Sequence, residues 1–412
     1  MLQSCISLEP DVYEFEEHAL FDVQAAVWIL GQHFVARSDF DSIKEMVCSR
    51  LWLTYRRNFP AIGGTGPTSD QGWGCMLRCG QMMLAEALLR LYVGKDWRWA
   101  RNLETEKPEY IEILREFADR KNALYSLHQI AQMGVSEGKL IGEWFGPNTV
   151  AQVLKKLAYF DSKSRLAVHV AMDNLVVLDD IYRVCAARCQ ADSSKGNAAA
   201  DAVGSSQSNE LNCPLLLLVP LRLGLTSLND CYLSAIQAFF TLPQCVGIMG
   251  GRPNHALYFY GIIGNDRLLY LDPHTCQDAV DLGGTGASNT DDADMVVVEH
   301  TDETPANNRP TTTVDDSSYH CSFILDIDAR SVDPSLALGL LARDRAELDD
   351  MVHRLTTDVF PASEPPLFEL MDKRPKGFPK FVPYSGEDPP KLRDYAVVEP
   401  RYDTDEEFEV LG

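Results

Sequence analysis

The most constraining feature of this chain is a glycine-containing turn that runs directly into a long helical pattern between residues 69 and 90. The turn holds Gly72 and Gly74, and apolar residues then recur at helical spacing from Met76 to Leu88. Cys75 therefore lies at the start of a helix, where free N–H groups and the helix dipole favour an anion. A thiol placed there has a lowered pKa and more nucleophilic thiolate. Most cysteines are small buried hydrophobes, so this stretch alone leaves a catalytic and a structural Cys75 both open.

Composition excludes several classes of protein. The 412 residues include 60 Asp and Glu against 37 Lys and Arg, a net charge of −23. A nucleic-acid binder needs a basic footprint, and docking on anionic lipid needs basic residues, so neither is expected. The eleven cysteines are scattered and odd in number, which favours reduced thiols. No secretion signal or apolar run of spanning length is present, so we expect a soluble, cytoplasmic protein.

The distribution of residue types along the chain predicts one large domain with flexible additions. We expect a flexible tail over 1–20 and a catalytic domain over 21–372, with flexible insertions at about 190–212 and 282–316. The proline-rich, charged residues 373–412 are expected to form a flexible acidic tail.

Within the domain, three strand-like runs are separated by turn signals. They cover 245–249, 256–263 and 267–271, and predict an antiparallel meander with a loop at 250–254. Helices are expected from Asp39 or Asp41 to Trp52, over 75–93, after Pro147 with Asn148 or Thr149 as a cap, and over 175–189.

The meander ends in a Leu-Asp-Pro-His sequence that supplies the partners a nucleophilic cysteine needs. Asp272 and His274 are two residues apart, so in an extended chain their side chains point to the same side. Pro273 biases Asp272 toward extended backbone. A Cys–His pair makes a nucleophile and a base, and a third group orients the imidazole. The short separation of Asp272 and His274 in sequence leaves open whether the carboxylate can reach the ring as that third group.

Two long motifs in this order resemble the autophagins, the autophagy cysteine peptidases that process ubiquitin-like modifiers. They are Asp-Gln-Gly-Trp-Gly-Cys-Met-Leu-Arg-Cys-Gly-Gln-Met at 70–82 and Tyr-Leu-Asp-Pro-His-Thr-Cys-Gln at 270–277. Shorter stretches at 27–31, 220–225, 250–254 and 317–321 are also similar to that family. The resemblance implies an α+β, papain-like cysteine peptidase fold. In that fold a central antiparallel sheet, a nucleophile at a helix N-terminus and a small extra lobe are expected.

The resemblance also implies an activity and a site. The activity is cleavage of a modifier precursor after a C-terminal glycine, and deconjugation of the modifier from phosphatidylethanolamine. By position, Cys75 matches the nucleophile, His274 the base, Asp272 the third member and Tyr55 an oxyanion-site tyrosine. The residues that match a cover over the resting site are Trp144, Gly250, Gly251, Arg252, Pro253 and Asn254.

The expected partners are ubiquitin-like autophagy modifiers of the GABARAP type. Near the C-terminus, Phe408 and Leu411 follow several acidic residues and resemble a short motif that docks on such modifiers by adding a strand to a sheet edge. An unrelated acidic tail would look similar. We expect a monomer with transient access to modifier-bearing membranes, and no metal or cofactor.

Other readings stay open. The chain could be a catalytically weak modifier-binding protein, or a thiol acyltransferase with the same Cys-His-Asp set. His255 is a rival base, although a surface role is the simpler interpretation. Gln71 lies too close to Cys75 for a papain-type oxyanion glutamine. A zinc site could be drawn from Cys79, Cys276, His320 and Cys321, but their spacing is not that of a zinc finger.

Overall fold

A large twisted sheet forms the centre of the molecule. The structure, a computed structural model, describes residues 24–99, 107–195, 211–283 and 315–386. Within these residues the sheet has nine strands, in the order β11-β9-β8-β7-β12-β6-β4, with β1 joined to β8 and β2 to β1. Its neighbours are antiparallel except for β4 and β6. The sheet is therefore mostly antiparallel, as the sequence predicts.

The strands of this sheet are β1 (Ala26–Ile29), β2 (Gln32–Val35), β4 (Ala167–Val170), β6 (Leu215–Arg222), β7 (Cys245–Arg252), β8 (His255–Ile263), β9 (Arg267–Leu271), β11 (Leu325–Asp328) and β12 (Ser335–Ala342). Two small parallel pairs lie outside it, formed by β10 (Cys276–Asp278) with β3 (Tyr55–Arg57) and by β13 (Glu369–Met371) with β5 (Leu175–Val177).

The α-helices are α2 (Phe40–Cys48), α3 (Cys75–Tyr92), α4 (Pro108–Glu116), α5 (Leu127–Gly134), α6 (Pro147–Phe160), α7 (Leu178–Lys195), α8 (Leu233–Thr241) and α9 (Arg345–Arg354). Shorter helical turns are η2 (Ile62–Gly64), η3 (Val135–Glu137), η4 (Asp230–Tyr232), η5 (Ser317–Tyr319), η6 (Ala329–Ser331), the π-helix η7 (Leu355–Val359) and η8 (Phe360–Ala362).

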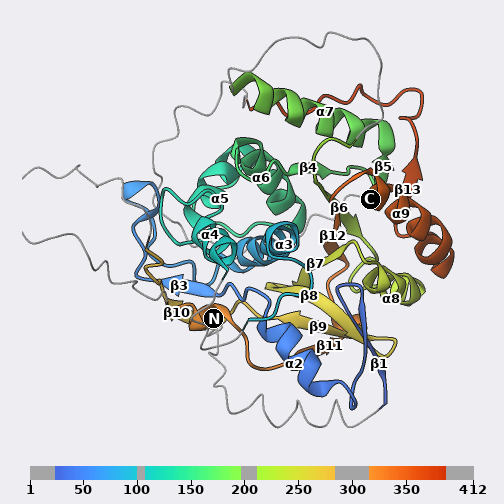
Figure 1. The fold of residues 1–412 in the computed structure, drawn as a ribbon, viewed down its shortest axis with the longest axis horizontal. Coiled ribbons are helices and arrows are strands. Elements are labelled where there is room, and N and C mark those ends of the chain that lie inside the picture. Colours follow the sequence, from blue (N-terminus) through green and yellow to red (C-terminus); the bar gives the residue numbers. More distant parts are fainter. Residues whose placement is uncertain (1–23, 100–106, 196–210, 284–314, 387–412) are drawn as a thin grey trace, which may run out of the picture.

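Helices cover the sheet from both sides. In Figure 1 the strands run from β4 at the top to β9 and β11 at the bottom, with α3 to α6 on the left and α8 and α9 on the right. Helix α3 contacts β7 and β8, and α6 contacts β4, β6 and β12. Helix α3 is buried along almost its whole length, from Cys75 to Arg90. A helix enclosed in this way holds its first residue in a fixed place against the sheet.

The central sheet contains the predicted meander, but the loop between its first two strands is shorter than expected. Strands β7, β8 and β9 pair in sequence order and antiparallel. The loop expected at 250–254 is shorter, because β7 continues to Arg252 and pairs it with His255. Only Pro253 and Asn254 turn the chain, and Asn254 has a positive φ of 60°. Asparagine tolerates that conformation better than most residues.

Three helix predictions differ from the structure at their ends. Helix α2 stops at Cys48, because the following residues turn into the segment that carries Tyr55. Helix α6 is capped by Gly146, and Pro147 occupies its first turn, where its missing N–H leaves no helical bond unmade. The helix expected over 175–189 begins only at Leu178, because 175–177 form strand β5 paired with β13.

The predicted additions to the domain are described in part. Helix α7 continues into the expected first insertion as far as Lys195. Residues 373–386 of the expected tail pack on the domain: Arg374 forms an ion pair with Asp180, and the Phe381 ring meets the edge of His169 at 5.4 Å. Residues 1–23, 196–210, 284–314 and 387–412 lie outside the described part, so the flexibility predicted there stays a prediction. None of the described helices combines the length and apolar character needed to cross a membrane.

Candidate active site

The start of α3 is fixed by a buried aspartate that the sequence analysis did not single out. Asp70 is fully buried and accepts hydrogen bonds from Arg78 Nε at 2.8 Å and from the Arg56 backbone N–H at 2.6 Å. Its backbone carbonyl accepts the Gly74 N–H at 2.9 Å. A Cβ on Gly74 would come within 2.3 Å of the Asp70 carboxylate, so glycine is needed there. These contacts place Cys75 as the first residue of α3, at a helix start with no side-chain cap.

Asp272 and His274 meet where β9 ends. Nδ1 of His274 lies 2.6 Å from Oδ1 of Asp272, and the His274 backbone N–H donates to the same oxygen at 2.9 Å. An ionised carboxylate only accepts, so Nδ1 carries a proton and Nε2 faces away from the aspartate. Closeness in sequence therefore does not prevent Asp272 from orienting the ring, which was the doubt raised by the spacing.

Cys75 and His274 perturb each other's pKa. Burial disfavours the thiolate, but the His274 imidazole, the Ala256 backbone N–H and the Tyr55 hydroxyl outweigh it and lower the pKa of Cys75. Burial likewise opposes the charge on His274, but Asp272 and Cys75 raise the pKa of His274 to about 9. Burial and the neighbouring Cys75 raise the pKa of Cys79, one turn along α3. The site thus favours a thiolate–imidazolium pair at Cys75.

The pair is poised without a closed hydrogen bond. Nε2 of His274 is buried and has no partner at ordinary hydrogen-bond geometry. Cys75 is only 2% exposed, and the His274 side chain 11%. Almost none of the Cys75 side chain is therefore open to solvent. Catalytic hydrogen bonds commonly tighten only when substrate is bound.

Tyr55 lies beside the same imidazole. It begins β3, whose parallel partner β10 starts two residues after His274, and its backbone N–H donates to the Pro273 carbonyl at 2.8 Å. The Tyr55 ring meets His274 edge to face, with centroids 5.3 Å apart. Trp52 holds the backbone just before Pro273, because its Nε1 donates to the Asp272 carbonyl at 2.7 Å. The structure therefore brings together Cys75, His274, Asp272 and Tyr55.

The residues predicted to form a cover lie on β7, in its turn into β8, and just before α6. Gly250, Gly251 and Arg252 belong to β7, and Pro253 and Asn254 form its turn into β8. Trp144 is 41% exposed in the segment just before α6. Their role as a cover stays a prediction. Phe408 and Leu411 lie outside the described residues, and so does the docking motif they would form.

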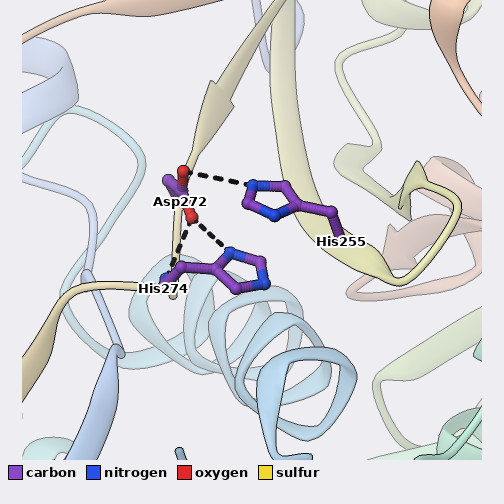
Figure 2. A group of neighbouring side chains, drawn as sticks. All are labelled: His255, Asp272 and His274. Carbon is purple, nitrogen blue, oxygen red and sulfur yellow. Dashed lines mark hydrogen bonds and ion pairs between the residues drawn. The ribbon is translucent and has the colours of Figure 1, made fainter. Parts of the chain in front are cut away.

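His255, which the sequence left as a rival base or a surface residue, is partly exposed and contacts both Asp272 and His274. It is the first residue of β8, and its ring stacks on His274 with centroids 3.6 Å apart and planes 8° from parallel. Its Nε2 lies 3.5 Å from Oδ2 of Asp272 (Figure 2). No local pattern signals this contact, because it depends on the register between β8 and β9.

Among the described residues, His255, Asp272 and His274 are the group with donor atoms close enough to hold a metal ion. The fit is poor, because both rings direct nitrogens at the one carboxylate, and the short contact to Asp272 places a proton on Nδ1 of His274. Stacked parallel rings also lack the converging lone pairs of a tetrahedral site. The zinc set drawn from Cys79, Cys276, His320 and Cys321 does not assemble in the described chain. His320 instead contacts the Cys48 carbonyl and Tyr110.

Comparison with known proteins agrees with this geometry. Residues 40–354 match the peptidase C54 catalytic domain. The chain belongs to the peptidase C54 family. It is 41% identical to Cysteine protease ATG4B of Gallus gallus over 98% of this chain and 99% of the relative. It is 42% identical to Cysteine protease ATG4A of the same species, over 95% and 98%, and 41% identical to Cysteine protease ATG4A of Homo sapiens, over 95% and 94%.

Membership of the peptidase C54 family confirms two expectations from the sequence. The fold is the papain-like cysteine peptidase fold, with its mostly antiparallel central sheet and a cysteine at the N-terminus of the buried helix α3. The chain is a cysteine peptidase of the autophagin type.

Proposed function

We propose that this peptidase C54 member cleaves ubiquitin-like autophagy modifiers of the GABARAP type after a C-terminal glycine. It acts both on precursors and on modifiers joined to phosphatidylethanolamine. The observation that carries the proposal is the site geometry in a peptidase C54 member: Cys75 begins α3, and His274, held by Asp272 at 2.6 Å, interacts with it. The lowered pKa of Cys75 and the raised pKa of His274 agree with a nucleophilic thiolate beside a charged acid.

The residues have distinct roles in the proposed reaction. The Cys75 sulfur attacks the glycine carbonyl, and the Tyr55 hydroxyl donates to the oxyanion that develops. His274 gives its proton to the departing amine, which is the next residue of a precursor or the amine of the lipid headgroup. A thioester remains. Water, deprotonated by His274, then attacks it and releases the modifier as a carboxylate, while Asp272 keeps the imidazole oriented throughout.

A glycine tail suits the burial of this sulfur. Cys75 is 2% exposed, so only a slender chain can approach once a cover moves. We propose Trp144 and the stretch Gly250–Asn254 as that cover, because a backbone without side chains can pass beneath an indole ring. We also propose that Phe408 and Leu411 dock a modifier by strand addition, and that the enzyme is a cytoplasmic monomer reaching membranes only through its substrate.

The test compares wild type with Cys75→Ser on a tagged modifier precursor, reading the mass of the new C-terminus. We expect wild-type cleavage immediately after the glycine, loss of cleavage in Cys75→Ser, and full activity in the exposed control Cys231→Ser. Undiminished cleavage by Cys75→Ser would exclude the mechanism.

A second assay separates the lipid reaction from precursor processing. Vesicles bearing phosphatidylethanolamine-linked modifier are incubated with each variant, and release of the modifier into solution is measured. We expect release by wild type and none by Cys75→Ser. A modifier carrying a C-terminal electrophile distinguishes the binding-protein alternative, for which binding would persist without an adduct on Cys75.

A further inference from the structure

The candidate triad has a fourth neighbour in direct contact with two of its members. Figure 2 shows His255 and His274 side by side, both with a nitrogen toward Asp272. The two oxygens of Asp272 are divided between them: Oδ1 lies 2.6 Å from His274 Nδ1, and Oδ2 lies 3.5 Å from His255 Nε2. A carboxylate contacted through both oxygens resists rotation about its terminal torsion, which is otherwise soft.

The backbone fixes His255 in this position. Tyr258 on β8 pairs with Leu271, the last residue of β9, so the turn that holds Pro273 and His274 follows directly on a paired strand end. His255 begins β8 three residues before Tyr258, and its ring stacks on that of His274. On its other side, Gly251 lies so near that a Cβ there would come within 2.1 Å of the His255 carbonyl oxygen. The hairpin therefore holds His255 between β7 and the end of β9.

His255 and the next residue, Ala256, contact different members of the site. The side chain of His255 reaches the acid–base pair, and the next backbone N–H, that of Ala256, contacts the Cys75 sulfur. The same hairpin therefore supplies the Ala256 N–H to the Cys75 sulfur and His255 Nε2 to the Asp272 carboxylate. The Tyr55 ring also contacts His274, edge to face, with centroids 5.3 Å apart.

We propose that His255 is a positioning residue. It holds the second oxygen of Asp272 and one face of the His274 ring, so that Nε2 of His274 stays directed at Cys75. It acts through Asp272 and His274, and the inference rests on the catalytic roles proposed for them. His255 is not the base, because the sulfur's interactions are with His274, Ala256 and Tyr55.

Two substitutions separate the contacts. His255→Phe keeps an aromatic ring for the stack and removes the donor to Asp272. His255→Gln keeps a donor and removes the ring. We expect His255→Phe to lower kcat about 10-fold with little change in KM, the usual scale for a hydrogen bond to a charged group. We expect His255→Gln to recover part of that loss.

The decisive comparison is a double-mutant cycle with Asp272→Ala. Because His255 acts through the carboxylate, His255→Phe should have little further effect on kcat once the carboxylate is gone. His33→Phe is the matched control. His33 is an exposed histidine on β2 whose ring also contacts an aromatic ring, that of Trp28. An equal loss in the Asp272→Ala background, or the same loss from His33→Phe, would overturn the proposal.

A measurement without a protein substrate keeps this test independent of the proposed function. The rate at which iodoacetamide alkylates Cys75 is followed against pH by mass spectrometry, with exposed Cys231 as an internal reference. We expect His255→Phe to shift the Cys75 profile to higher pH and to leave Cys231 unchanged. An unshifted Cys75 profile overturns the positioning role. A failure to cleave modifiers with the shift intact would instead count against the proposed function.

Discussion

A thiolate in a buried position persists only if a positive charge and hydrogen-bond donors replace the water it has lost. Cys75 has these in His274, the Ala256 N–H and the Tyr55 hydroxyl, and they come from separate elements of the chain. Cys79, one turn away on the same helix, lacks them, and burial raises the pKa of its thiol. The pKa values of the two thiols therefore shift in opposite directions because of neighbours that are remote in sequence.

The first prediction concerns the pH dependence of cleavage. The lowered pKa of Cys75 makes kcat/KM rise below the ordinary thiol value of about 8.5. The pKa of His274, raised to about 9, keeps the imidazolium charged until that pH, so kcat/KM falls above it. A bell-shaped profile of precursor cleavage is expected.

The raised pKa of His274 also makes the stability of the folded protein depend on pH. Since the pKa of His274 is higher in the folded protein, the contribution of this shift to the free energy of unfolding is fully present below about pH 6.5 and is lost as the pH rises through about 9.

The control for the pH profile of cleavage is the alkylation of Cys75 in the variant His274→Ala. The pH profile of that alkylation should move to higher pH. A single rise in kcat/KM near 8.5 with no alkaline fall would contradict the ion pair.

At the scale of elements, the packing of α3 against α6 and the sheet places the sulfur. Gly80 is on the face of α3 turned to α6, and a Cβ there would come within 2.3 Å of Val150 Cγ1 and 3.3 Å of Leu154 Cδ1. The close approach of the two helices depends on that missing side chain.

Gly80→Ala is therefore expected to lower the free energy of unfolding by about 1–3 kcal/mol, despite the better helix propensity of alanine. Urea unfolding measures it. Val150→Ala removes the atom that the new methyl would meet, so it should be less destabilising in the Gly80→Ala background than in wild type. Simple additivity of the two changes would show that the helices are not in close contact at Gly80.

Local patterns predicted much of this element structure. The Gly74–Cys75 junction and the three meander strands follow from spacing and turn residues. The contact between Asp272 and His274 was also expected, but it forms in a turn, where the His274 N–H donates to Asp272, and not in an extended chain. The Asp70–Arg78 pair, the Trp52 contact to the Asp272 carbonyl and the stacked His255 did not follow. The contacts of Trp52 and His255 depend on how separate strands and loops pack. Asp70 and Arg78 are only eight residues apart, but their pairing depends on the conformation of the turn that precedes α3.

At the scale of the whole molecule, a buried ion cluster connects α3 to three other parts of the chain. Glu86 accepts from Arg50 Nη1 and from Arg90 Nε, both at 2.6 Å, and all three side chains are at most 5% exposed. Arg90 also donates to the carbonyls of Leu30, after β1, and Pro243, before β7. The helix that carries Cys75 is thereby fixed to both the edge and the centre of the sheet.

Glu86→Gln leaves two buried guanidinium groups without their anion, so we expect the free energy of unfolding to fall by about 3–5 kcal/mol. Although burial opposes its charge, Arg50 and Arg90 lower the pKa of Glu86. Its contribution is therefore present above its ordinary value of about 4.3 and is lost as pH falls.

Urea unfolding at neutral and acidic pH measures both effects. The matched control is Asp349→Asn, which breaks the exposed pair with Arg345 on α9 and should change stability by less than about 1 kcal/mol. Equal effects of the two substitutions would contradict the importance given to burial.

The burial of the Cys75 sulfur has a consequence for chemical damage. A thiolate is the form that peroxides oxidise, and this one is 2% exposed when no substrate is present. If Trp144 and the stretch Gly250–Asn254 cover the sulfur as proposed, we expect oxidative inactivation to be slow in the resting protein and faster during turnover. The enzyme would thus be most vulnerable to an oxidant while it is working.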